Sequence, residues 1–215
     1  MSVEMKDIQR KELFQGVTEA IVGQIPVASF FLAAIDNVKS NVLQRKFVEW
    51  QQMVGERLSA LEDSVFANLG NNETFATTLL KTSELAAQSN NKKNEYLANA
   101  IKYTAENNID EDLLIIFLNL ISKYSLTHIA VLKYFQEPSL YRKEYVDFPM
   151  PIIDISPKFN YSLSEIVTNE LHKDGLLKSN NCTEFTFKKD GIITGSNGTT
   201  KLGNQFIDFF GIKNN

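Results

Sequence analysis

LSEIVTNELHKDGLL (Leu163–Leu177), EFTFKKDGIIT (Glu184–Thr194) and TTKLGNQFIDFF (Thr199–Phe210) are the three stretches that decide the predicted fold. The first has apolar residues at helical spacing and predicts a helix that ends at Gly175. The second predicts a short two-stranded hairpin that turns at Asp190-Gly191. The third predicts a closing helix, so the end of the chain has the order helix, hairpin, helix.

This order is typical of a winged-helix module, and we predict a winged-helix-like α+β module with a small β-hairpin over residues 124–215. Leu126–Phe135 would be its first helix, beginning at Ser125 or Thr127. Residues 138–157 are rich in proline and predict a long connection.

The first part of the chain, residues 1–123, predicts a helical bundle and makes the whole fold mainly α. Apolar residues recur every three or four positions from Val27 to Leu69, which indicates one long amphipathic helix with a break between Val42 and Phe47. Such a helix must pack on other helices or on a second chain. Shorter helices are predicted over 73–89, 92–106 and 111–123, with Asn72 and Asp110 as caps.

Composition favours a globular protein without a strong nucleic-acid-binding charge. Hydrophobic residues make up 43 % and charged residues 22 % of the chain, and the net charge is −4. Residues 1–123 hold 12 basic and 16 acidic side chains, whereas residues 124–215 hold 10 of each. The single cysteine, Cys182, excludes a disulfide within the chain. We therefore expect a reducing, cytoplasmic location, and we see no signal peptide.

The sequence contains no motif of a known catalytic, cofactor or metal site. His128 and His172 have no partner at metal-ligand spacing. A Gly-x-Ser-x-Gly elbow and a phosphate-binding P-loop are both absent, and Cys182 has no neighbouring histidine motif. We therefore predict no metal, no cofactor and no enzymatic activity. The histidines are expected at one helix start and near one helix end.

A winged-helix module usually reads DNA, and the candidate recognition helix here is Ser164–Lys173. Its outward residues would be Glu165, Asn169, Glu170 and Lys173, so two acids would face the phosphates. The concentrated positive residues are Lys173, Lys178, Lys188 and Lys189, and these are the candidate nucleic-acid contacts. The charge balance favours protein contact over DNA, which stays as an alternative.

An apolar segment lies near the start of the chain. Ala20–Ile35 includes Phe30, Phe31 and Leu32, which are candidate contacts with a membrane or with a second copy of the chain. The segment is shorter than the roughly 20 apolar residues that a spanning helix needs. A core position in the bundle is favoured, and a membrane-active effector remains an alternative.

Several stretches together resemble a known group of proteins. They are Gly23–Pro26, Arg45–Trp50, Glu56–Glu62, Tyr96–Ala100, Leu126–Leu132, the helix that ends at Gly175–Leu177, and Thr200–Phe206. Their order resembles bacterial helical proteins that end in a winged helix, and among named groups the abortive-infection alpha family of phage-resistance proteins. The resemblance implies a role in host or prophage defence and brings no catalytic residues with it.

The expected function is thus that of a non-enzymatic interaction protein, with a protein partner or self-association. A DNA-binding regulator that uses the winged helix, and a membrane-active effector that uses residues 20–35, are the two alternatives.

Overall fold

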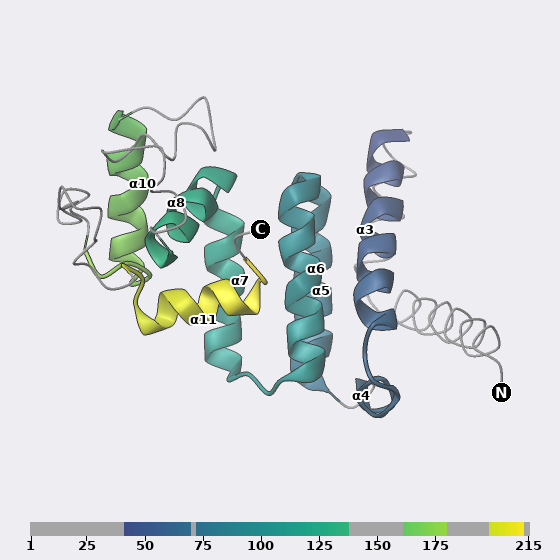
Figure 1. The fold of residues 1–215 in the computed structure, drawn as a ribbon. Helices are drawn as coiled ribbons and strands as arrows, with labels where there is room; N and C mark the ends of the chain where they lie inside the picture. Colours follow the sequence, from purple (N-terminus) through teal and green to yellow (C-terminus); the bar gives the residue numbers. More distant parts are fainter. Residues whose placement is uncertain (1–40, 70–71, 138–160, 180–197, 213–215) are drawn as a thin grey trace. The chain divides into compact units, whose positions relative to one another are not determined.

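A computed structural model of the chain describes residues 41–69, 72–137, 161–179 and 198–212. All regular elements in these ranges are helices (Figure 1): α3 (Asn41–Ser59), α4 (Asp63–Asn68), α5 (Glu73–Gln88), α6 (Asn91–Glu106), α7 (Glu111–Lys123), α8 (Leu126–Gln136), α10 (Tyr161–Lys173) and α11 (Lys201–Phe209). The chain divides into two compact units, Met1–Leu118 and Asn119–Asn215, and the division falls within α7.

The prediction of a winged-helix-like α+β module with a β-hairpin is wrong. The described residues contain no β-strand, and the chain on either side of residues 180–197 meets in a single antiparallel bridge between Leu177 and Thr199. A wing needs a two-stranded ladder, whereas here the Lys178 N–H donates to Gly198 O (2.9 Å) and the chain then enters α11 directly. The predicted hairpin at Glu184–Thr194 lies outside the described residues.

The long helix predicted over Val27–Leu69 is also corrected. Residues 27–40 lie outside the described ranges, and the rest is divided into α3 and α4 by a turn in which the Leu61 N–H donates to Leu58 O (3.1 Å). Helix α3 is continuous where a break was predicted. Leu58 and Leu61 are both buried, so the apolar spacing continues through the turn and did not reveal it.

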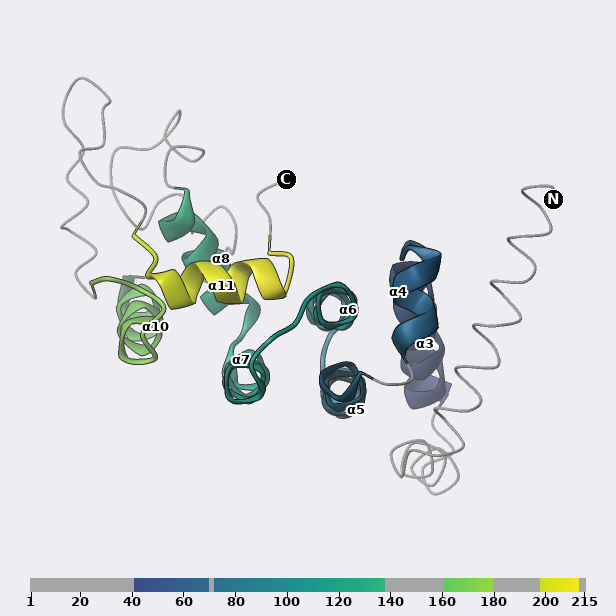
Figure 2. The ribbon, with the colours of Figure 1, turned by 90° about the horizontal axis from the view of Figure 1, so that it is seen from below.

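Helix α6 is the centre of the first unit. Figure 2 shows α5 and α6 end-on and side by side. Four α6 side chains have no exposed surface: Leu97, Ala98, Ala100 and Ile101. Small residues let α3 approach closely, and the Arg57 Nε donates to Asn99 Oδ1 (2.7 Å) across that contact. The Trp50 indole N–H donates to Ser83 Oγ (3.3 Å), which ties α3 to α5.

The caps of these helices follow from the sequence. Asn72 accepts the Phe75 N–H (2.9 Å) at the start of α5, and Asn90 accepts the Lys93 N–H (2.9 Å) at the start of α6. Asp110 accepts the Leu113 N–H (3.1 Å) at the start of α7. Each cap satisfies a backbone donor that the helix itself leaves without a partner. The caps predicted at Asn72 and Asp110 are confirmed.

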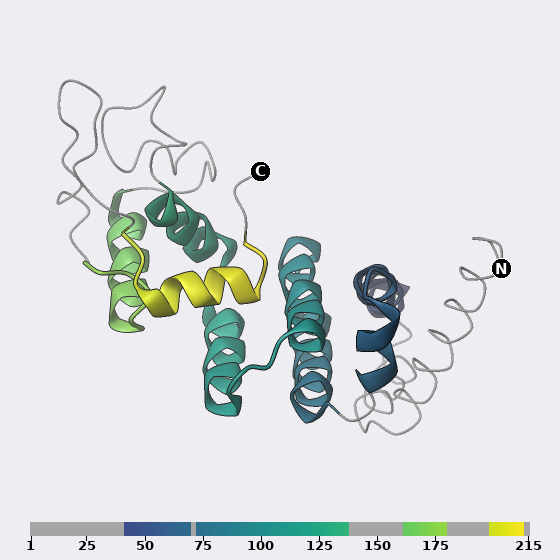
Figure 3. The ribbon, with the colours of Figure 1, turned by 60° about the horizontal axis from the view of Figure 1, so that its bottom comes forward.

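Aromatic side chains fill the second unit, where α8 packs against α10 and α11. Phe206 and Phe210 lie with ring centroids 4.8 Å apart, and Phe135 is fully buried. Figure 3 shows α11 (yellow) beginning beside one end of α10 (green) and running away from it. Gly203 permits the close approach of α11 to the turn after α10, because a Cβ on this residue would lie 2.2 Å from Leu176 O.

Candidate functional site

Five polar or aromatic residues meet where α8 packs against α10, and we call them the α8–α10 cluster. They are Tyr124, Ser125, His128, Glu170 and Asp174. Ser125 is the N-cap residue of α8, and His128 follows it by one helical turn. Glu170 and Asp174 come from the end of α10 and the turn after it. Two segments far apart in sequence therefore supply one group of titratable side chains.

His128 is held at both ring nitrogens. Its Nδ1 lies 2.9 Å from Ser125 Oγ and accepts the Ser125 backbone N–H (3.2 Å). Its Nε2 lies 2.8 Å from Glu170 Oε2. Since Nδ1 accepts a backbone N–H, the neutral ring carries its proton on Nε2 and donates it to Glu170.

The plane of the His128 ring is fixed by Tyr124. The two rings stack with centroids 4.9 Å apart and an angle of 13° between their planes. The Tyr124 hydroxyl donates to Asp174 Oδ2 (2.7 Å), and the Lys123 ammonium donates to the same oxygen (2.6 Å). Burial and the Asp174 carboxylate raise the pKa of Tyr124 far above its ordinary value. Tyr124 is therefore a neutral hydrogen-bond donor that supports the histidine ring.

The two histidines occupy the expected places, at a helix start and near a helix end. His172 lies in the last turn of α10, and its Nδ1 is 3.0 Å from Leu177 O. What the sequence did not reveal is the pairing of His128 with Glu170. Ser125 and His128 have the spacing of a capping box, a local signal, whereas Glu170 lies 42 residues further along the chain. Only the packing of α8 on α10 joins them.

The structure describes two of the four lysines predicted to contact nucleic acid. Lys173 and Lys178 are both exposed, at the end of α10 and just after it. Lys188 and Lys189 lie outside the described residues, as do the predicted membrane contacts Phe30, Phe31 and Leu32. The structure therefore brings no lysine cluster together within the described ranges.

Helix α10 buries one face and exposes the other. Val167, Thr168 and Leu171 are buried, whereas Glu165, Ile166 and Lys173 are exposed. Ile166 has 55 % of its surface accessible, the largest value among the exposed large apolar side chains of the described residues. Glu170, predicted to point outward, contacts His128 and keeps 41 % of its side chain exposed. The described residues of this face thus include two acids, one base and an apolar side chain.

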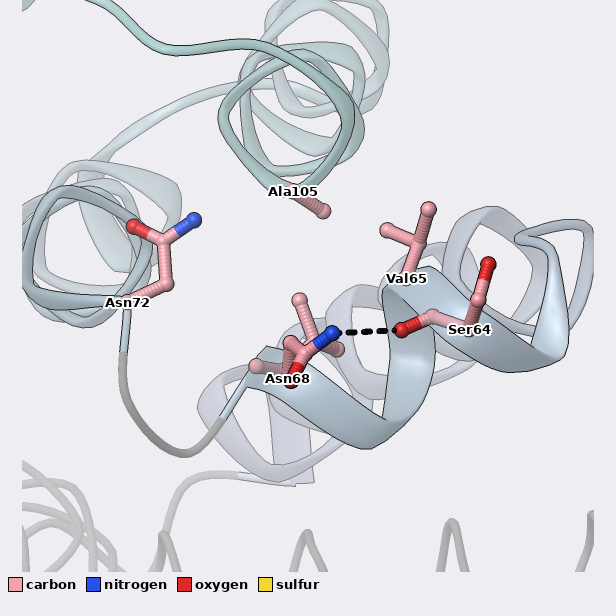
Figure 4. A pocket seen from close by; sticks show the side chains of 6 residues that line it. Ser64, Val65, Asn68, Asn72 and Ala105 are labelled. Carbon is pink, nitrogen blue, oxygen red and sulfur yellow. Dashed lines mark hydrogen bonds between the residues drawn. The ribbon is translucent and has the colours of Figure 1, made fainter.

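A shallow hollow lies in the first unit between α4, α5 and α6 (Figure 4). Its volume is about 270 Å³, and its lining includes Asn68, Asn72 and Ala105. The amide group of Asn68 donates to Ser64 O (2.9 Å), and that of Asn72 donates to Thr104 O (3.0 Å). Both amides therefore serve the ends of helices, and the hollow offers no group that is set toward a ligand.

Neither a metal site nor a spanning helix is found in the described ranges. No group of three or more histidine, cysteine, aspartate or glutamate side chains there could hold a metal ion. No single described helix is long and apolar enough to cross a membrane, although α7 and α8 together, as a broken pair, reach that length and composition.

Comparison with known proteins gave no family model, no curated protein and no solved structure that matches this chain.

Proposed function

We propose that this chain acts by binding a protein partner through the exposed face of α10. The observation that carries the proposal is Ile166, an aliphatic side chain that is 55 % exposed on a helix whose opposite face is fully packed. A single exposed aliphatic residue is common on protein surfaces, so Ile166 indicates a binding surface only where the residues around it also fit one.

The contacts around Ile166 favour a binding surface that is already rigid before a partner binds. Glu170 is tied to His128 on α8, and Asp174 accepts hydrogen bonds from Lys123 and Tyr124. These three bonds hold α10 and the turn after it in place. A helix that is already rigid loses little conformational entropy when a partner binds, so more of the contact energy remains as affinity.

The charges on this face favour a protein over a nucleic acid. Glu165 and Lys173 are both exposed on α10, and the Glu170 side chain is 41 % exposed, so these residues give the face no excess of positive charge around Ile166. A surface that binds phosphates by charge carries a clear excess of lysine and arginine. A polar rim around an apolar centre is instead typical of a protein–protein contact.

A photo-cross-linking amino acid at position 166, in the full chain and in its own cell, tests the proposal. Position 116 is the matched control, because Ile116 is 46 % exposed on α7. We expect one protein to cross-link from position 166 and not from position 116. The purified partner should then bind the chain, with Ile166→Glu weakening Kd at least about tenfold and Ile116→Glu leaving it unchanged. Equal cross-linking from both positions, or only a nucleic-acid product, would contradict the proposal.

A role in phage defence is a separate proposal, supported by the resemblance to abortive-infection proteins alone. Expression of the chain in a phage-sensitive host should lower the plating efficiency of at least one phage. If protein binding through α10 underlies the role, Ile166→Glu should restore plating, whereas Ile116→Glu should not. Unchanged plating across a broad phage panel would contradict it.

A further inference from the structure

We propose that Ser125 is an activated nucleophile, with His128 as its general base and Glu170 as the carboxylate that orients the base. The substrate class is a carboxylic ester with a small apolar acyl group. Ser125 Oγ lies 2.9 Å from His128 Nδ1, and His128 Nε2 lies 2.8 Å from Glu170 Oε2. A nucleophile and a base at this distance, with a third group on the base, form the arrangement that activates serine. This activity goes beyond the proposed binding function and does not depend on it.

The neutral form of the histidine has the tautomer that this base requires. Because Nδ1 accepts the Ser125 backbone N–H and lies 2.9 Å from Ser125 Oγ, its lone pair faces the serine and the ring proton sits on Nε2. When Nδ1 takes the hydroxyl proton, the ring becomes positive beside the Glu170 carboxylate. The His128 side chain is 11 % exposed and that of Glu170 is 41 % exposed, so water screens this attraction on the carboxylate side.

Helix capping accounts for only part of the arrangement. A cap needs Ser125 and the N–H-accepting nitrogen of His128, and nothing else. Here Glu170 binds the opposite ring nitrogen from another helix, and the Tyr124 ring stacks on the imidazole with 13° between the planes. Three independent contacts therefore set the position of the ring, which is what a general base requires.

The surroundings of Ser125 fit an ester. Ser125 is exposed, so a substrate can reach its hydroxyl. The start of α8 is the positive end of the helix, where the oxygen of an attacked carbonyl would gain negative charge. The neighbouring Leu126 side chain is 37 % exposed, which favours an apolar acyl group.

In the proposed reaction, Ser125 Oγ attacks the carbonyl carbon and its proton passes to His128 Nδ1. The bond from carbon to the alkoxy oxygen then breaks, and the proton moves from Nδ1 to the leaving alcohol. Water attacks the acyl-serine, gives its proton to Nδ1, and releases the acid as Oγ takes that proton back. The net change is one ester and one water converted to one acid and one alcohol.

A fluorophosphonate probe tests the nucleophile on the full chain. Attack by Oγ on phosphorus expels fluoride and leaves a stable adduct, which peptide mass spectrometry assigns to one residue. We expect the adduct on Ser125 and hydrolysis of p-nitrophenyl butyrate at the same site. Ser122 is the matched control, because it is also exposed and its hydroxyl donates to the backbone oxygen of Asn119 (2.8 Å).

Three variants distinguish a catalytic role of these residues from a role in helix capping. Ser125→Asn keeps a favoured cap residue and should abolish labelling. His128→Gln keeps a side chain that can accept the N-cap N–H and should lower the labelling rate at least about a hundredfold. Glu170→Gln should lower the rate, because the carboxylate that orients the imidazole and faces the positive ring formed in the reaction is gone. Circular dichroism melts of each variant check that it is folded.

Absence of the adduct on Ser125 in the wild-type chain would overturn the proposal without any variant. Equal labelling of Ser122 and Ser125, or an unchanged rate in folded His128→Gln, would overturn it as well. The outcome is independent of protein binding, since Ile166→Glu should retain labelling while losing the partner.

Discussion

At the scale of single residues, the close approach of α11 to the turn after α10 depends on the absence of a side chain at position 203. A Cβ there would lie 2.2 Å from the backbone oxygen of Leu176, and backbone cannot swing aside as a flexible side chain can. We expect Gly203→Ala to lower the free energy of unfolding by about 2 kcal/mol, despite the better helix propensity of alanine. Urea unfolding followed by circular dichroism measures this change. Gln205→Ala, an exposed position on the same helix, should be nearly neutral.

The buried hydroxyl of Tyr124 predicts a loss of stability in alkali. Its pKa is raised in the folded state by burial and by Asp174, so the folded chain keeps a proton that the unfolded chain releases above about pH 10. The stabilisation is therefore complete below about pH 10 and falls as the pH rises further. We expect the unfolding free energy of the wild type to fall faster above this pH than that of Tyr124→Phe, by up to about 1.4 kcal/mol per pH unit. Parallel curves for the two proteins would contradict this assignment.

The same residues show why the candidate site could not be predicted from sequence. Ser125 and His128 are three positions apart and suggest a helix start, which the structure has. Nothing local to them indicates Glu170, because that contact is made by packing over a separation of 42 residues. The sequence can therefore predict a cap but not the carboxylate that turns the cap into a three-residue chain of hydrogen bonds.

At the scale of elements, the prediction succeeded where the signal is local. Asn72 and Asp110 cap α5 and α7 as predicted, since a cap needs only three neighbouring residues. The prediction failed where the structure depends on contacts between residues that are distant in the sequence. The turn between α3 and α4 keeps the apolar spacing intact, and the predicted hairpin required a ladder where the described chain has only the Leu177–Thr199 bridge.

The capping of α6 gives a test at this scale. The exposed Asn90 side chain accepts the Lys93 N–H (2.9 Å), and its loss leaves a helix donor without a protein partner. We expect Asn90→Ala to cost about 1 kcal/mol and Asn90→Asp to cost little, because aspartate caps equally well. Asn91→Ala, the next residue, is the control and should be neutral or slightly stabilising. A loss of stability in Asn91→Ala as large as that in Asn90→Ala would show that the cap is not the cause.

At the scale of the whole molecule, the net charge and its distribution determine how strongly the chain binds nucleic acids. The chain carries 22 basic and 26 acidic side chains, a net charge of −4. The exposed Lys173 and Lys178 lie at the end of α10 and just after it, and the same helix exposes Glu165. Affinity for DNA without sequence preference comes from neutralised phosphates and the release of their counterions. A chain with this balance neutralises few phosphates.

We therefore expect no measurable binding of the full chain to a labelled duplex of about 30 base pairs, by fluorescence polarisation at about 50 mM salt. Lys178→Glu should leave this result unchanged, because no phosphate contact is lost. Binding that weakens about a thousandfold between 50 and 200 mM salt would contradict the prediction, since that steepness requires six or more phosphate contacts. Such a result would place a concentrated positive surface on the molecule and would weigh against the exposed face of α10 as its principal binding surface.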